Sequence, residues 1–165
     1  MRGYYSKGCN GFTFRDIELD DYLWLHEYIY SNPEITMWNS YMPHEKLIQS
    51  KCSVLRNYIK TKFTKMIYLI VYYDKIPVGT LCINEVFPGT ATISYNVIKD
   101  YQNKGIGTSI VSTACELCES LCYNNIIAYI LPNNKGSIRV CTKNGFYIKV
   151  LNWRYGAIKK LHQLS

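Results

Sequence analysis

The chain has 165 residues, of which 48% are apolar and 19% are charged. This composition is typical of a globular protein and excludes a disordered one, and the length fits a single domain over residues 1–165, with residues 1–10 as a looser extension. Nineteen Lys and Arg against twelve Asp and Glu give a formal charge of +7. That balance favours an anionic partner, such as nucleic acid, a membrane surface or a phosphorylated small molecule.

The compartment can be predicted from features that the sequence lacks. No apolar run approaches the roughly 20 residues that cross a bilayer, and residues 1–7 lack the apolar core of a secretory signal. Three of the seven cysteines, Cys115, Cys118 and Cys122, share one face of an expected helix, but no His or further Cys follows at zinc-site spacing. We interpret them as core residues and predict no metal site. Free cysteines in this number suit the cytoplasm, and we expect no membrane partner.

In chain order, the first expected elements are a strand and two helices. Residues 12–17 alternate like a half-buried strand. Asp20 or Asp21 can cap a helix that runs to Tyr30, where residues 31–33 (Ser-Asn-Pro) end it. A second helix is expected after Pro43, because apolar residues follow it at helical spacing. They are Ile48, Cys52, Leu55 and Ile59.

The middle of the chain predicts three strands. Residues 66–73 and 76–85 flank Asp74-Lys75, which is consistent with a hairpin. Pro88-Gly89 interrupts the pattern, and residues 90–98 form the third strand.

The last third of the chain alternates helices and strands. A helix is expected from Ile106 to Leu121, and the continuous apolar run 126–131 predicts a strand that is buried on both faces. A short helix then opens at residues 132–134, with Gly145 as its C′ residue. Two closing strands complete the chain, at residues 146–151 and 154–161.

The most informative stretch is residues 101–108, Tyr-Gln-Asn-Lys-Gly-Ile-Gly-Thr, between an expected strand and an expected helix. Two glycines let the backbone turn tightly, so that the amides of residues 103–108 can converge at a positive helix N-terminus. Such an arrangement suits a pyrophosphate, and Lys104 adds charge. The spacing fits neither a P-loop nor a dinucleotide-binding turn. A glycine-capped loop that binds nothing is the alternative.

Two ordered motifs resemble a known family. Gln102-x-x-Gly105-x-Gly107, preceded by the strand residues 93–98, resembles the acetyl-CoA pyrophosphate signature of the GNAT superfamily of N-acetyltransferases. Asn134-x-x-Ser137, followed by residues 144–146 (Asn-Gly-Phe), is similar to the family's second cofactor segment. The resemblance covers about residues 76–150 and is strongest to the RimJ/RimL-like branch, which acetylates the N-termini of ribosomal proteins.

The resemblance implies a fold and a reaction. The fold would be α/β (α+β), with a mixed, mostly antiparallel sheet of about seven strands and about four helices. Its central parallel strands, here residues 90–98 and 125–131, would splay apart. The protein would be an acetyl-CoA-dependent N-acetyltransferase, with acetyl-CoA as its cosubstrate.

The resemblance also implies the residues that hold the cosubstrate. Backbone groups of Asn96, Val97 and Ile98 would pair with the pantetheine arm, and the 102–108 loop would hold the diphosphate. The loop residues concerned are Gln102, Asn103, Lys104, Gly105, Ile106, Gly107 and Thr108. Asn134 would bond the pantetheine arm, and Ser137 would lie near the sulfur or make a second cofactor hydrogen bond. Asn134 can also cap the short helix, and both of its roles are compatible.

The candidate catalytic base departs from the family pattern. Many relatives carry a glutamate where Thr92 stands, and Thr92 cannot act as a base near neutral pH. Glu85, at the end of the preceding strand, is the first candidate. The alternative is that Glu85 only faces solvent at the end of its strand. His26 and His44 are further candidates from the acceptor side.

The candidate acid is open as well. Cys141 stands where many relatives place a tyrosine, and it can protonate a thiolate or simply face the core. Ser137 is the other candidate, and water can replace both.

The acceptor is expected to be a primary amine, on a protein N-terminus or a small molecule. Aromatic residues that can line its site, or equally belong to the core, are Trp24, Tyr28, Tyr30, Trp38, Tyr41, Trp153 and Tyr155. The main alternative function is a catalytically weak or silent acyl-CoA-binding module. A nucleic-acid partner is not expected, because no recognition motif for one is present. The protein is expected to be a monomer or a homodimer.

Overall fold

The computed structural model describes residues 11–37, 66–152 and 154–161. Strands β2 (Met66–Tyr73) and β3 (Ile76–Phe87) form the predicted hairpin. Its turn residues, Asp74 and Lys75, have φ angles of 48° and 68°. Positive φ at both central residues is what a two-residue turn needs to match the twist of the strands. The expected helix after Pro43 lies outside the described residues.

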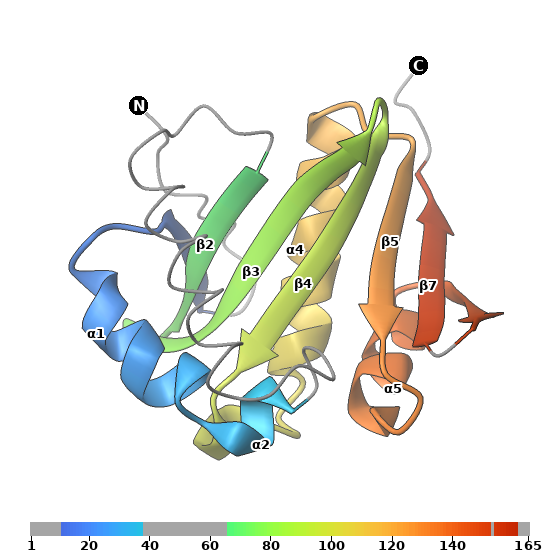
Figure 1. Ribbon diagram of the computed structural model, residues 1–165. Coiled ribbons are helices and arrows are strands. Elements are labelled where there is room, and N and C mark those ends of the chain that lie inside the picture. Colours follow the sequence, from blue (N-terminus) through green and yellow to red (C-terminus); the bar gives the residue numbers. More distant parts are fainter. Residues whose placement is uncertain (1–10, 38–65, 153, 162–165) are drawn as a thin grey trace.

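The strands form one seven-stranded sheet in the order β1-β2-β3-β4-β5-β7-β6. Its remaining strands are β1 (Phe12–Asp16), β4 (Thr90–Val97), β5 (Asn125–Ile130), β6 (Tyr147–Leu151) and β7 (Arg154–Lys160). β4 and β5 pair in parallel, and all other neighbours are antiparallel. Figure 1 shows β4 and β5 diverging towards their arrowheads. The predicted sheet with its splayed parallel pair is confirmed.

Helices cover both faces of the sheet. α4 (Ile106–Ser120) and α5 (Lys135–Lys143) lie on one face, and α1 (Asp21–Leu25) and α2 (Pro33–Thr36) lie on the other, in front of the sheet in Figure 1. The described residues therefore contain four α-helices, together with a short 3₁₀ segment, η2 (Lys99–Tyr101). No helix within the described ranges is both long and apolar enough to span a bilayer.

Each face of the sheet has its own apolar core. Ile83 and Ile93 pack with Ile110 and Ala114 of α4 in the larger cluster. A smaller cluster packs on the other face, and its most buried members are Ile17, Leu25, Ile29 and Ile70. Cys115 and Cys118 are buried in the larger cluster, as interpreted from the sequence, and Cys122 is exposed.

The predicted capping of the N-terminal helix is wrong, whereas its predicted end at Tyr30 is confirmed. Asp20 and Asp21 do not cap it: Asp20 makes no capping hydrogen bond, and the Asp21 carboxylate accepts from the Glu18 amide and the Arg15 guanidinium. The helix reaches Tyr30, but its last turn, η1 (His26–Tyr30), is π-helical, with the Ser31 amide donating to the carbonyl of His26.

Two further observations concern Asn32 and β5. The helix ends at Tyr30 as predicted, and Asn32 also begins the next helix, because its side chain accepts from the Glu34 amide at 3.0 Å and caps α2. β5 is not buried on both faces. Ile126, Ala128 and Ile130 face the core, whereas Ile127 is only partly buried and Tyr129 is 45% exposed. On that face the Arg154 guanidinium lies over the Tyr129 ring, 3.7 Å from its centroid, and leaves the ring partly exposed.

Candidate active site

The parallel strands are joined over only three residue pairs. Thr90, Ala91 and Thr92 pair with residues 125–127, and the ladder between β4 and β5 ends there. Beyond it, the Ile98 amide donates to Val78 of β3, so by alternation the backbone groups of Val97 face β5. The Val97 carbonyl accepts from the Gln102 side chain at 3.0 Å. The end of β4 thus presents backbone polar groups to an opening in the sheet.

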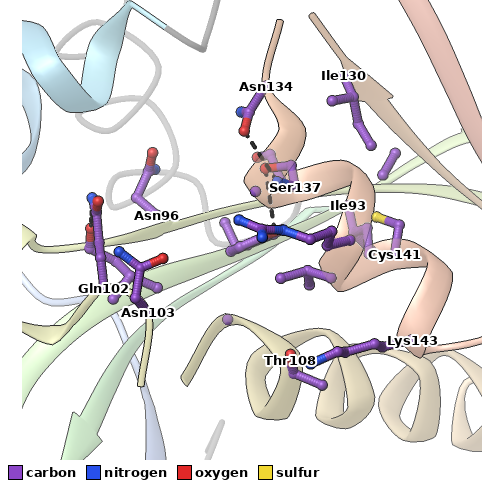
Figure 2. Close-up of a pocket in the computed structure, with 18 of the residues that line it drawn as sticks. Ile93, Asn96, Gln102, Asn103, Thr108, Ile130, Asn134, Ser137, Cys141 and Lys143 are labelled. Carbon is purple, nitrogen blue, oxygen red and sulfur yellow. Dashed lines mark hydrogen bonds between the residues drawn. The ribbon is translucent and has the colours of Figure 1, made fainter. Parts of the chain in front are cut away.

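A pocket of about 550 Å³ occupies this opening, between the N-termini of α4 and α5 (Figure 2). Apolar side chains of Ile93, Ile130 and Val140 line part of it. Polar side chains line the rest, among them Ser94, Asn96, Gln102, Asn103, Thr108, Asn134, Ser137, Arg139 and Lys143. An elongated molecule with a charged end and a less polar end fits such a lining.

The loop before α4 has the backbone shape that its glycines predict. Gly105 has a φ of 82°, and a Cβ there would meet nothing within 4 Å. Its left-handed conformation is therefore the reason for glycine. Gly107 is a glycine for a different reason, because a Cβ would lie 3.2 Å from the ring of Tyr95. Together with Asn103, also left-handed at 58°, they shape a loop whose amides precede the positive end of α4.

The other wall of the pocket is the start of α5. The Asn134 side chain accepts from the Ser137 amide at 3.0 Å, so Asn134 is the N-cap of α5. The Tyr95 hydroxyl, from β4, donates to Ser137 Oγ at 3.2 Å. At the far end of α5, Asn144 Nδ2 donates to the carbonyls of Thr108 and Val140 at 3.2 and 2.9 Å. α5 is thus tied to β4 at its first turn and to α4 at its C-terminal end.

Charge in the pocket is positive. Arg139 and Lys143 stand one turn apart on α5 and line the pocket, with Lys143 extending towards Thr108 in Figure 2. No Asp, Glu or His occurs among the described residues of the lining. The lining therefore suits an anion, and no described lining residue is a strong base. The described residues also hold no group of three His, Cys, Asp or Glu suited to a metal ion.

Burial changes the acidity of two lining groups. It raises the pKa of Tyr95 to about 12, an effect that the hydrogen bond with Ser137 partly opposes. It also raises the pKa of the Cys141 thiol to about 12, and Cys141 is fully buried. Both groups keep their protons at neutral pH, and Cys141 is a weaker proton donor than an ordinary thiol.

The structure brings most of the predicted cofactor residues together. Those that line the pocket are Asn96, Val97, Gln102, Asn103, Gly105, Gly107, Thr108, Asn134 and Ser137. Three others do not. Ile98 uses its amide to bond Val78, Lys104 lies over the ring of Tyr101, and Ile106 is buried in the core.

The predicted bases are not in the pocket. Glu85 lies opposite Ala91, so its side chain is on the α4 face, and it contributes to raising the pKa of Tyr123, which burial mainly causes. It lies beside the closed end of the β4–β5 pair, away from the opening. His26 is exposed near Ser31, outside the lining. His44 lies outside the described residues.

None of the described aromatic residues proposed for the acceptor site is among the described residues of this lining. Tyr30 is buried, with its hydroxyl 2.7 Å from that of Tyr68, and Trp24 stacks on Tyr28. Tyr155 packs against the larger core. The other three, Trp38, Tyr41 and Trp153, lie outside the described residues.

Among the described lining residues that the sequence analysis did not name as site residues are Tyr95, Tyr129, Arg139 and Lys143. The alternation of β4 was a usable signal for Tyr95, since it shares a face with Ile93. The four-residue spacing of Arg139 and Lys143 was a signal that they share a face of α5.

Comparisons with known proteins identify the family. Residues 12–147 match the family model described as an acetyltransferase (GNAT) domain, which assigns the protein to the acetyltransferases. The chain belongs to the GNAT family, whose members are generally acetyl-CoA-dependent N-acetyltransferases. No curated protein sequence matches the chain.

Solved structures share the fold at low identity. A RimL ribosomal L7/L12 α-N-protein acetyltransferase in complex with coenzyme A is 12% identical, with a TM-score of 0.73 over 94% of this chain and 97% of that one. RimJ of Mycobacterium smegmatis, in complex with CoA-disulfide, is 21% identical, with a TM-score of 0.73 over 93% and 83%. A spermidine N-acetyltransferase of Vibrio cholerae, with CoA and spermine, is 18% identical, with a TM-score of 0.69 over 91% and 93%.

Proposed function

We propose that this chain transfers an acetyl group from acetyl-CoA to a primary amine, on a protein N-terminus or a small molecule. One observation carries the proposal: the glycine loop before α4 and the Asn134–Ser137 segment of α5 line the same pocket, at the opening between β4 and β5. A cytoplasmic location and a monomeric or homodimeric state remain predictions from the sequence.

The lining fits acetyl-CoA at both ends. The loop amides from Asn103 to Thr108, at the positive end of α4, would hold the diphosphate. Arg139 and Lys143, facing the same loop from α5, would add charge to the phosphate end. The backbone of Val97 and the side chain of Asn134 offer hydrogen bonds along the opening, where the pantetheine arm would lie. Ser137 and Ile93 would border the thioester.

Acetyl-CoA supplies an activated acyl group, because a thiolate is a good leaving group. In the reaction the amine nitrogen bonds to the carbonyl carbon, the carbon–sulfur bond breaks and its electron pair goes to sulfur. The proton lost by nitrogen ends on the thiol. The pocket residues hold the partners in line, which supplies much of the rate. Since no described lining residue is a carboxylate or an imidazole, we propose that pocket water accepts the amine proton.

The lack of a base among the described lining residues also favours a second function, an acyl-CoA-binding module with little or no turnover. The two functions make different predictions about transfer and the same prediction about binding.

Two measurements test the proposal. Calorimetric titration with acetyl-CoA should show one site per chain, with micromolar affinity. Gly107→Glu should abolish this binding while the circular dichroism spectrum is retained, because a bulky anion would enter the loop that would hold the diphosphate. Mass spectrometry would then follow transfer to a panel of N-terminal peptides and polyamines, the acceptor classes named for the RimL and spermidine enzymes. Binding with no transfer to any acceptor would select the module, and no binding would refute both.

A further inference from the structure

A pair of hydroxyl groups spans the pocket between β4 and α5. Tyr95 comes from β4, Ser137 comes from the first turn of α5, and the two side chains are 42 positions apart in sequence. Both line the pocket, and the Tyr95 hydroxyl donates to Ser137 Oγ at 3.2 Å. This hydrogen bond links β4 directly to the first turn of α5.

The position of Ser137 is fixed from two sides. Its amide is held by the cap residue Asn134, a hydrogen bond drawn as a dashed line in Figure 2. Its side-chain oxygen accepts from Tyr95, whose ring packs close to the helix start at Gly107 and near Val140. A Cβ on Gly107 would come within 3.2 Å of that ring, so the ring packs against the glycine where a larger residue would crowd it.

The direction of the hydrogen bond decides what Ser137 can donate. The Tyr95 hydroxyl donates to Ser137 Oγ, and burial raises the pKa of Tyr95 to about 12, so the phenol keeps the donated proton at neutral pH. A hydroxyl oxygen that accepts one hydrogen bond still has its own hydrogen to donate. The Ser137 hydrogen is therefore not used towards Tyr95 and is available to the pocket.

We propose that Tyr95 is a positioning residue, which directs the Ser137 hydroxyl hydrogen towards the sulfur of bound CoA and so stabilises the departing thiolate; this inference rests on the proposed function. When the carbon–sulfur bond breaks, its electron pair goes to sulfur and Ser137 donates a hydrogen bond to it. An alcohol is a much weaker acid than a thiol, so Ser137 keeps its proton. The proton lost by the amine neutralises the sulfur through water.

This role suits Ser137 better than Cys141. Cys141 is fully buried in the core cluster and is a poorer donor than a hydroxyl. Ser137 is only partly buried and stands at the helix N-terminus, where the dipole also favours a negative sulfur.

The test measures ionisation of the thiol of bound CoA, which needs no acceptor amine. The full-length protein is saturated with CoA, and the ultraviolet absorbance of the thiolate is followed against pH. A parallel titration with desulfo-CoA subtracts the protein's own cysteines and tyrosines. Ser137→Ala should raise the pKa of the bound thiol by about one unit, a tenfold change, because a hydrogen bond to a charged group is lost. Tyr95→Phe should raise it by about half a unit, because the serine hydroxyl loses its orientation.

The double variant separates positioning from a merely structural role. If Tyr95 acts through Ser137, adding Tyr95→Phe to Ser137→Ala should change the thiol pKa no further. Tyr73→Phe, which removes a hydroxyl from a tyrosine on β2 outside the pocket, should leave it unchanged. Two outcomes would overturn this inference without touching the proposed function. In one, Tyr95→Phe binds CoA and its bound thiol has the same pKa as in the unaltered protein. In the other, Tyr95→Phe shifts the thiol pKa equally with and without Ser137→Ala. Should Tyr95→Phe not fold, an unchanged thiol pKa in Ser137→Ala would overturn it equally. Failure of the unaltered protein to bind CoA would instead refute the proposed function.

Discussion

Replacing Gly105 with alanine tests whether the loop before α4 depends on a residue in the left-handed backbone conformation. Gly105 has a φ of 82°, and its Cβ position is empty to 4 Å, so the cost to alanine is conformational and not steric. Holding alanine in the left-handed region costs about 1–2 kcal/mol. The less flexible unfolded chain offsets about 0.4–1 kcal/mol of this. We expect a net loss of about 1 kcal/mol in the free energy of unfolding, or about 3 °C in Tm for a chain of this size.

Urea denaturation followed by circular dichroism measures this loss, and two variants act as controls. Gly105→Asn should lose about half as much, because asparagine tolerates the left-handed region. Gly136→Ala, the same change inside α5, should be neutral or stabilising by up to about 1 kcal/mol, since its Cβ would meet only Asn134 Oδ1 at 3.6 Å. If Gly105→Ala is as stable as the unaltered protein, or Gly105→Asn is no better than alanine, then backbone conformation is not what position 105 requires.

Three further predictions concern charge. Arg139→Gln and Lys143→Gln should each weaken CoA binding severalfold in calorimetry, with a smaller effect at high salt. Lys149→Gln on β6, outside the pocket lining, should leave the affinity unchanged. Equal effects of all three substitutions would mean that only net charge matters. Asp21→Asn should lower the free energy of unfolding by about 2 kcal/mol in urea titrations, because it removes a 2.6 Å ion pair with the largely buried Arg15; a loss near zero would show that solvent screens the pair. Glu85→Gln should leave the transfer rate within about twofold if Glu85 takes no part in proton transfer. A rate at least tenfold slower, about 1.4 kcal/mol of barrier, would restore Glu85 as the candidate base.

The backbone shape of the loop before α4 and the start of α5 could be predicted from the sequence, because their determinants are local. Gly105 and Gly145 supply positive φ angles, and Asn134 caps the helix that follows it. Each of these roles depends on a few neighbouring residues. The turn at Asp74-Lys75 could be predicted for the same reason.

The residues that sequence reasoning missed or misplaced depend on long-range register. The alternation of β4 indicates which face Tyr95 lies on, but its contact with Ser137 depends on how β4 and α5 meet, which no local pattern reports. Glu85 was chosen for its closeness in sequence to Thr92, but the β3–β4 register puts these two residues on opposite faces of the sheet. Tyr129 was assigned to a doubly buried strand, because an apolar run cannot reveal that the sheet opens beside it.

The three-pair junction of β4 and β5 divides the sheet into two leaves, β1–β4 and β5–β7–β6. Within each leaf the strands are joined by longer ladders, whereas the junction contributes only the bonds of residues 90–92 and 125–127. A molecule bound in the opening touches both leaves and so adds contacts that hold them together. By linkage, its binding free energy adds to the free energy needed to separate the two leaves. Backbone amides at the junction should consequently exchange with solvent more slowly when the opening is filled, although the bound molecule touches none of them.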